Sequence, residues 1–123
     1  MLKLRLRNLI RIKMKLLKIE YSVYESFAVQ NKSNIKAIMN DLRELGVRGL
    51  KYTSYLMKDN KTFIHISQVD SEEAELLLHA LPSFKYFTKE RDLNLERPVL
   101  IEELALVGSS FDIFPVRDEN LAF

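Results

Sequence analysis

Apolar and polar residues alternate from Met14 to Tyr24, and this two-residue period predicts a first β-strand. One face of the strand carries Leu17, Ile19, Tyr21 and Val23. A helical period follows from Ser26 to Leu45. We expect Ser26 to be the N-cap of this helix and Gly46 to end it in the left-handed conformation.

The stretch from Gly49 to Val69 contains two runs of β-branched and aromatic residues on either side of a short polar break. This pattern predicts a β-hairpin. The break contains Asp59 and Asn60, which tolerate left-handed backbone angles and can hydrogen-bond their own backbone. The hairpin is therefore expected to turn at these two residues.

A second helical region is predicted after the hairpin. Asp70 is the expected N-cap, because Glu73 three residues later completes a capping box. Pro82 suits the first turn of a continuing or restarted helix. Pro98 blocks helix, and an apolar run from Val99 to Gly108 predicts the last strand.

The expected order is strand, helix, strand, strand, helix, strand. This order predicts an α+β fold of the ferredoxin-like split β-α-β type, in which two helices cover one face of a four-stranded antiparallel sheet. Both faces of the predicted strands are apolar, so the sequence leaves open which of them meets the helices. The other face needs a cover, and a second copy of the chain supplies one in an isologous homodimer.

We expect a basic extension at residues 1–13, one domain at residues 14–110 and a tail at residues 111–123. The extension has five Lys and Arg residues and no acid, which leaves 14 basic and 17 acidic residues in the rest of the chain. Three interpretations of the extension stay open: Met14 is the natural start, the extension adds a strand, or it is a disordered basic tail. Because the body is net acidic, we expect no nucleic-acid partner.

The composition excludes several kinds of site. The chain has no cysteine, which excludes disulfides and thiolate metal sites and fits a reducing compartment, so we expect a cytoplasmic protein. No apolar run approaches the roughly 18 residues that span a bilayer, so we expect no membrane partner. His79 has no histidine or acid at a metal-ligand spacing, and no phosphate loop or dinucleotide fingerprint is present. We therefore expect neither a metal nor a cofactor.

Four short stretches resemble a known family. They are GLKYTSY at 49–55, FIHI at 63–66, ALPSFKYF at 80–87 and VGS at 107–109. These stretches are similar to the dimeric α+β barrel proteins related to antibiotic biosynthesis monooxygenases, and the resemblance spans about residues 15 to 110. It implies that the sheets of two subunits face each other as a barrel, with a ligand pocket between the sheet and the helices of each subunit.

The resemblance also bears on chemistry. Some relatives oxidise aromatic polyketides without a metal or a flavin, and others bind and degrade haem. This chain has no tryptophan, so the Asn-Trp-His set of the haem-degrading relatives is not matched and haem chemistry is not carried over. A full catalytic set of the polyketide oxygenases is not found either.

His65 is the candidate catalytic base, because the pKa of a histidine lies close to neutral pH. It lies mid-strand, with Phe63, Ser67 and Val69 on the same face. As a base it would deprotonate a phenolic or enolic substrate, and the resemblance implies that the resulting carbanion reacts with oxygen. The other interpretation is a histidine that hydrogen-bonds a backbone or carboxylate partner in the barrel wall.

The candidate ligand-binding residues are Asn34, Tyr52, Tyr55, Phe87 and Glu103. The strand period places Tyr52 and Tyr55 on opposite faces, so we expect one in the pocket and the other at the dimer interface, unless both only fill volume. Asn31 and Asn34 either bind a ligand carbonyl or mark an exposed helix start. Glu103 either tunes the basicity of His65 or pairs with a cation across the sheet.

Two functions from different classes stay open. In the first, a homodimer binds an unknown small-molecule ligand and oxidises it as a cofactor-independent monooxygenase acting on an aromatic or enolisable substrate. In the second, the same fold is a non-catalytic ligand-binding, sensing or structural dimer. The sequence does not decide whether the protein is an enzyme, because one fold hosts many functions.

Overall fold

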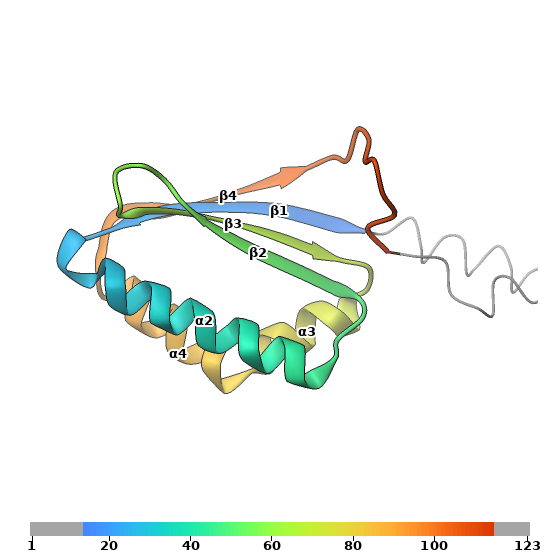
Figure 1. Cartoon of the computed structure of the whole chain (residues 1–123), viewed down its shortest axis with the longest axis horizontal. Helices are drawn as coiled ribbons and strands as arrows, with labels where there is room; N and C mark the ends of the chain where they lie inside the picture. The colour runs from blue at the N-terminus through green and yellow to red at the C-terminus, as the bar shows by residue number, and fades with distance from the viewer. Residues whose placement is uncertain (1–13, 115–123) are drawn as a thin grey trace, which may run out of the picture.

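The computed structural model describes residues 14–114; the predicted extension at 1–13 and residues 115–123 of the predicted tail lie outside this range. The strands are β1 (Lys15–Val23), β2 (Leu50–Leu56), β3 (Thr62–Val69) and β4 (Leu95–Leu104). They form one antiparallel sheet in the order β2-β3-β1-β4. The helices α2 (Ala28–Leu45), α3 (Glu72–Ala80) and α4 (Pro82–Asp92) all cover one face of this sheet (Figure 1). The predicted ferredoxin-like α+β fold is confirmed.

The period of the strands decides which side chains enter the core. Tyr21 and Val23 of β1, together with Phe63 and Val69 of β3, lie on the helix-covered face and are almost completely buried. They pack against apolar residues of the helices, among them Ile35, Ile38, Leu78 and Phe87. The sequence had left both faces open, and the structure assigns the face of Tyr21 and Phe63 to the core.

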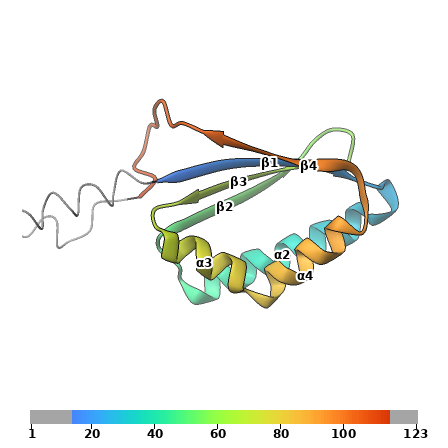
Figure 2. The same ribbon diagram turned by 180° about the vertical axis from the view of Figure 1, so that it is seen from behind.

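The opposite face of the sheet is not covered by any described helix (Figure 2). Tyr55 and Leu100 lie on this face and are 56% and 57% exposed. Near its middle, Lys18 pairs with Glu20 at 3.4 Å and with Glu102 at 3.7 Å. The uncovered face is therefore apolar over much of its area, with a small charged cluster in the middle.

The predicted turns are confirmed. Gly46 ends α2 with a left-handed φ of 62°, and Asn60 in the hairpin has a φ of 63°. Asp59 holds the hairpin through its carboxylate, which accepts hydrogen bonds from the backbone N–H groups of Lys61 at 3.0 Å and Thr62 at 2.8 Å. Pro82 occupies the first turn of a restarted helix, so the second helical region is two helices rather than one.

Both predicted N-caps are wrong. Ser26 lies inside a short 3-10 turn, η1 (Glu25–Phe27), and α2 begins at Ala28 without a side-chain cap. At α3 the cap is Ser71, whose Oγ accepts a hydrogen bond from the N–H of Ala74 at 3.2 Å. Asp70 instead continues the strand pairing, because its N–H donates to the carbonyl of Gly49 at 2.9 Å.

The last strand begins four residues before the predicted start at Val99 and ends at Leu104 rather than at Gly108. Pro98 is tolerated inside it because β4 is an edge strand, where a missing N–H breaks no inner ladder. The pairing of β1 with β4 also shifts register between Glu20 and Ser22, beside this proline. No helix within residues 14–114 is long and apolar enough to cross a membrane, and the cytoplasmic location stays a prediction.

We expect Ser71→Ala to lower the free energy of unfolding by about 1 kcal/mol, because the first turn of α3 loses its cap. The matched change Ser26→Ala removes no capping hydrogen bond and should cost a few tenths of that. Urea unfolding followed by circular dichroism measures both. Equal losses in the two variants would contradict the assignment of the cap to Ser71.

Candidate functional site

A cavity of about 470 Å³ lies between the sheet and the helices α3 and α4. Its volume falls in the range of roughly 300–1,000 Å³ that is typical of small-molecule sites. The sheet contributes Leu17, Ile19, Tyr52, Ser67, Val99 and Ile101. The helices contribute Glu75, Leu78, His79, Phe84, Lys85, Thr88, Lys89 and Arg91. The walls are therefore mainly apolar on the sheet side and polar or charged on the helix side.

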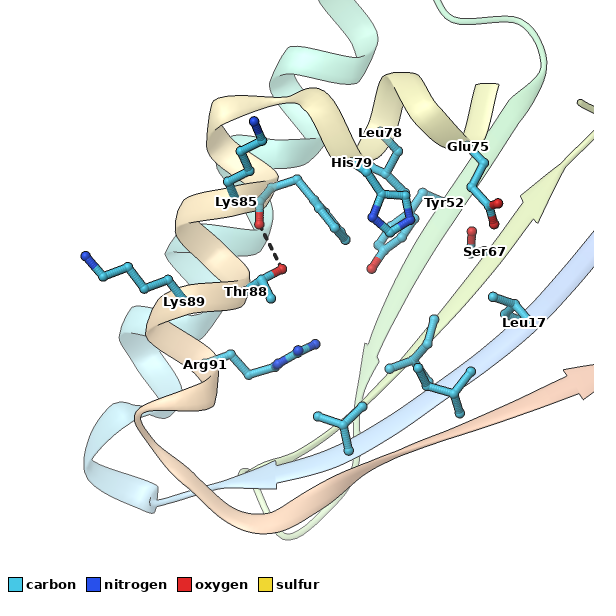
Figure 3. Close-up of a pocket in the computed structure, with 14 residues that line it drawn as sticks. Leu17, Tyr52, Ser67, Glu75, Leu78, His79, Lys85, Thr88, Lys89 and Arg91 are labelled. Carbon is cyan, nitrogen blue, oxygen red and sulfur yellow. Dashed lines mark hydrogen bonds between the residues drawn. The ribbon is translucent and has the colours of Figure 1, made fainter. Parts of the chain in front are cut away.

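Helix α4 presents one face to the cavity. Phe84, Thr88 and Arg91 follow each other at the spacing of one helix face, and all three line the cavity. In Figure 3 the Arg91 side chain points into the cavity, whereas the ammonium ends of Lys85 and Lys89 extend away from it. Of these three cations of α4, Arg91 is therefore the one directed at a ligand.

A chain of hydrogen bonds crosses three strands beneath the cavity. Nε2 of His65 lies 2.8 Å from the Tyr21 hydroxyl, and Nδ1 lies 2.9 Å from the Tyr52 hydroxyl. The amide nitrogen of Asn31, on α2, donates to the Tyr21 hydroxyl at 2.9 Å. Of the four hydrogen-bonded residues, Tyr52 is the one that lines the cavity. The chain of hydrogen bonds therefore begins in the core and ends at the cavity wall.

The strand register explains this arrangement. His65 on β3 lies opposite Ile19 of β1 and opposite Ser54 of β2. Tyr21 and Tyr52 are each two residues away from those partners, on the same face of the sheet. Diagonal neighbours of this kind lie within reach of aromatic side chains. The central imidazole therefore meets one tyrosine on each adjacent strand.

One assignment of protons gives the hydroxyl of Tyr21 and the N–H of His65 an acceptor each. If Tyr21 donates its hydroxyl proton to Nε2, then Nδ1 of His65 carries a proton and donates it to the Tyr52 oxygen. The Tyr52 hydroxyl is then free to donate into the cavity. In the other tautomer the Tyr21 oxygen receives two N–H groups, and its own proton has no acceptor among residues 14–114.

Aromatic rings enclose the hydrogen-bond chain. The Tyr21 ring stacks on His65 with centroids 5.3 Å apart, and Phe87 lies 5.4 Å from the same imidazole. The Arg91 guanidinium lies 5.3 Å from the centroids of both the Tyr21 and the Phe87 rings. His65 is 0% exposed, so its ring is shielded from water.

Burial controls the protonation of the chain. Desolvation, helped by the nearby charge of Arg91, lowers the pKa of His65 to about 3. Burial also raises the pKa of Tyr21 and Tyr52 well above the usual range of tyrosine, although Arg91 acts in the opposite direction. At neutral pH the imidazole and both phenols are therefore uncharged, and Arg91 is the charged group beside them.

No family model matches the chain, and no curated protein matches it. Solved structures do share its architecture. A provisionally named antibiotic biosynthesis monooxygenase from Bacteroides thetaiotaomicron superposes with a TM-score of 0.70 at 11% identity, over 83% of this chain and 97% of the other. Rv0793 from Mycobacterium tuberculosis gives a TM-score of 0.66 at 15% identity, over 80% of this chain and 100% of the other. This chain has the antibiotic biosynthesis monooxygenase-like fold.

A third structure with this fold, a provisionally named antibiotic biosynthesis monooxygenase from Nitrosomonas europaea, gives a TM-score of 0.63 at 10% identity, over 76% of this chain and 90% of the other. At these identities the similarity shows the fold of the chain and leaves its chemistry to the residues of the site. The resemblance seen in the sequence is therefore confirmed for the architecture.

The structure brings together three of the predicted site residues, because Tyr52 and Phe87 both contact His65. Tyr52 lines the cavity, and His65 hydrogen-bonds the Tyr52 hydroxyl from the core. The expected separation of the tyrosines is confirmed, because Tyr55 lies on the uncovered face of the sheet and is 56% exposed. The expected backbone or carboxylate partner of His65 is replaced by two phenol hydroxyls.

The other predicted ligand-binding residues lie outside the cavity wall. Phe87 is buried beneath it against His65, and Asn34 is buried on α2, where it accepts a hydrogen bond from Gln30 at 2.8 Å. Glu103 is exposed on β4, in register with Leu17. Roles for these residues in binding stay predictions.

Sequence reasoning did not single out Tyr21 or Arg91 as site residues. Tyr21 looked like one more core residue on an alternating strand, and only the pairing of β1 with β3 places it beside His65. Arg91 is one of several cations on α4, and its helical spacing from Phe84 and Thr88 was the available signal. His79 also lines the cavity, edge-on to Phe84 at 5.2 Å, although a structural or surface role was expected.

We expect acid to destabilise the fold through His65. Its folded pKa of about 3 lies below the ordinary value, so the unfolded chain binds the proton first and stability falls as the pH drops below about 6.5. From pH 7 to pH 5 this effect amounts to about 2 kcal/mol. Urea midpoints of the wild type and of His65→Gln at both pH values measure this loss of stability. The variant should lose less stability between pH 7 and pH 5 than the wild type. An equal loss in both proteins would contradict the buried neutral imidazole.

Proposed function

We propose that this protein binds an aromatic or enolisable small molecule in the cavity and oxidises it with dioxygen, without a metal or an organic cofactor. The observation that carries the proposal is the hydrogen-bond chain from Tyr21 through His65 to Tyr52, which ends at the cavity wall. The fold shared with provisionally named antibiotic biosynthesis monooxygenases supports it.

Binding follows from the two sides of the cavity. The apolar side chains of β1 and β4, namely Leu17, Ile19, Val99 and Ile101, suit the flat body of an aromatic compound. The Tyr52 hydroxyl directs a hydrogen bond at an oxygen of the substrate. The charge of Arg91 in the same wall favours the anionic form of that substrate over the neutral one.

Proton removal proceeds through Tyr52, because His65 does not reach the cavity itself. Proton transfer uses the tautomer of His65 that is protonated at Nε2, in which Nδ1 is free to accept and the Tyr21 proton loses its acceptor. In this tautomer a bound enol or phenol donates to the Tyr52 oxygen, and Tyr52 donates to Nδ1 of His65. When the substrate ionises, its proton passes to Tyr52 and the Tyr52 proton passes to Nδ1. The imidazolium then donates to both tyrosines, and the Tyr52 hydroxyl donates to the new substrate oxyanion.

The ionised substrate supplies the electrons for oxidation. In its carbanion form it transfers one electron to dioxygen, and the resulting radical and superoxide combine to form a carbon–oxygen bond. The peroxide takes back the proton held by His65 and Tyr52, and the hydroperoxide then loses water. In this balance a CH₂ group and O₂ become a carbonyl group and H₂O, and every electron comes from the substrate.

A non-catalytic ligand-binding function is the second candidate, and the lowered pKa of His65 favours it. With a pKa of about 3 in the free protein, the imidazole is a weak base. Catalysis requires that the substrate anion raise this pKa by its own charge. If it does not, the same cavity binds a ligand without turning it over.

We also propose that the protein is a homodimer in which the uncovered faces of two sheets meet. The exposed apolar residues of this face support the proposal, among them Tyr55, Leu100 and Leu104. An isologous pairing of these faces removes them from water. The ion pairs of Lys18 with Glu20 and Glu102 lie on the same face, so the contact also has to accommodate these charges.

We expect anthrone, a flat aromatic ketone that enolises, to stimulate oxygen uptake by the wild-type protein. His65→Ala removes the proton acceptor and should lower the rate by about a hundredfold or more. Tyr52→Phe removes the group that contacts the substrate and should lower it to a similar extent. An oxygen electrode, with anthraquinone quantified by chromatography, measures the turnover.

The outcomes separate the two candidate functions. Unchanged turnover in His65→Ala would refute the role of His65 as base. Saturable binding of anthrone with no oxygen uptake above the spontaneous rate would favour the binding function. Lys85→Met is a matched control, because Lys85 lines the cavity but its ammonium points away from it (Figure 3).

Leu100→Asp should convert the dimer to a monomer, because it places a carboxylate in each half of a symmetric apolar contact. Leu76→Asp makes the same change at a similarly exposed position on α3 and should leave the dimer intact. Analytical ultracentrifugation of the wild type and both variants measures the mass. A monomeric wild type, or a dimer unaffected by Leu100→Asp, would contradict the sheet-to-sheet contact.

A further inference from the structure

The guanidinium of Arg91 is only partly paired. Oδ1 of Asp92 accepts a hydrogen bond from Nε at 3.0 Å and forms an ion pair with Nη2 at 2.9 Å. Within residues 14–114 no hydrogen-bond partner is found for Nη1. The Arg91 side chain is 13% exposed, so the protein shields most of it from bulk water, and the side chain lines the cavity. Nη1 is therefore available to donate hydrogen bonds to a ligand in the cavity.

The structure holds this guanidinium in one place. It lies over the faces of Tyr21 and Phe87, 5.3 Å from each centroid, in two cation–π contacts. Its bonds to Asp92 fix the Nε edge and leave the Nη1 side unpaired. In Figure 3 this side chain points from α4 into the cavity. Arg91 is therefore a preorganised donor that needs little rearrangement to bind an anion.

The charges nearby leave room for an anion. Asp92 is 51% exposed, so water screens its carboxylate and weakens its neutralisation of Arg91. The acid that lines the cavity, Glu75, lies at the far end from Arg91 (Figure 3) and pairs with Lys15 at 3.0 Å. The cavity therefore has a cationic end at Arg91, next to apolar walls.

We propose that Arg91 binds the carboxylate of an amphipathic ligand, an organic acid whose aromatic or aliphatic body lies between the apolar side chains of β1 and β4. A planar guanidinium matches a carboxylate in geometry and charge, which a lysine ammonium does not. This inference rests on the proposed small-molecule function of the same cavity and specifies the class of its ligand.

A pair of probes of nearly equal shape tests the inference. 2-Naphthoate is an anion at neutral pH, whereas 2-naphthylmethanol has the same ring system and no charge. Isothermal titration calorimetry of the full chain measures the affinity for each. We expect the wild type to bind naphthoate more tightly than naphthylmethanol by about tenfold or more.

Arg91→Met keeps most of the apolar stem and removes the charge. It should weaken naphthoate binding by about tenfold or more and change naphthylmethanol binding by less than about twofold. Lys89→Met is the matched control, because it removes the same charge from a residue that lines the cavity but points away from it. It should leave both affinities unchanged.

Asp92→Asn provides a second test that damage to the fold does not mimic. Removing the competing carboxylate frees Nε and Nη2 of Arg91, so the affinity for naphthoate should rise several-fold while that for naphthylmethanol stays the same. Thermal melting of each variant reports on the fold.

The outcomes distinguish this inference from the proposed function. Equal wild-type affinities for the two probes would overturn the anion site and leave the cavity function standing, and so would equal losses in Arg91→Met and Lys89→Met. A lower naphthoate affinity in Asp92→Asn would also overturn the anion site. Failure of both probes to bind the wild type would count against the small-molecule function itself.

Discussion

Burying the imidazole of His65 requires a hydrogen-bond partner for each of its two nitrogens, and this requirement organises the structure around the cavity. Tyr21 and Tyr52 provide these partners from the two strands beside β3. A change in the pairing of either strand by one residue would turn its tyrosine to the other face of the sheet and leave a buried nitrogen unpaired. The hydrogen bonds of His65 therefore favour the observed register of β1, β2 and β3.

The helices complete this buried cluster rather than merely cover it. Helix α2 contributes Asn31, whose amide nitrogen donates to Tyr21, and α4 contributes Phe87 and Arg91 against the same ring. Where the small side chain of Ser67 and the apolar side chains of β1 and β4 meet α3 and α4, the packing leaves the cavity open. The buried chain and the cavity share Tyr52, so a ligand that changes the hydrogen bond of Tyr52 acts directly on His65.

The uncovered face of the sheet bears a different constraint. Several of its apolar side chains, among them Tyr55, Leu100 and Leu104, stay exposed in the single chain. The two faces of the sheet therefore have different roles. The helix-covered face builds the core and the cavity, and the uncovered face is the surface through which we propose that two chains associate.

Local patterns in the sequence were sufficient for most of the fold. Alternation on either side of Asp59 and Asn60 predicted the hairpin, and Gly46 and Pro82 marked helix boundaries correctly because their backbone preferences are local. The N-caps were missed because Ser26, Asp70 and Ser71 are all acceptable caps, and the choice depends on where the strand pairing ends. The limits of β4 were missed because only its place at the edge of the sheet makes Pro98 acceptable.

The sequence by itself determined the order of the elements and the alternation that gives each strand two distinct faces, because both follow from contacts between near neighbours in the chain. The tertiary structure decided which face entered the core and how the strands paired. It thereby decided that Tyr21, Tyr52 and His65 form one hydrogen-bonded chain and that Arg91 points into the cavity. These residues come from different elements, and only the packing of helices on a paired sheet brings them together.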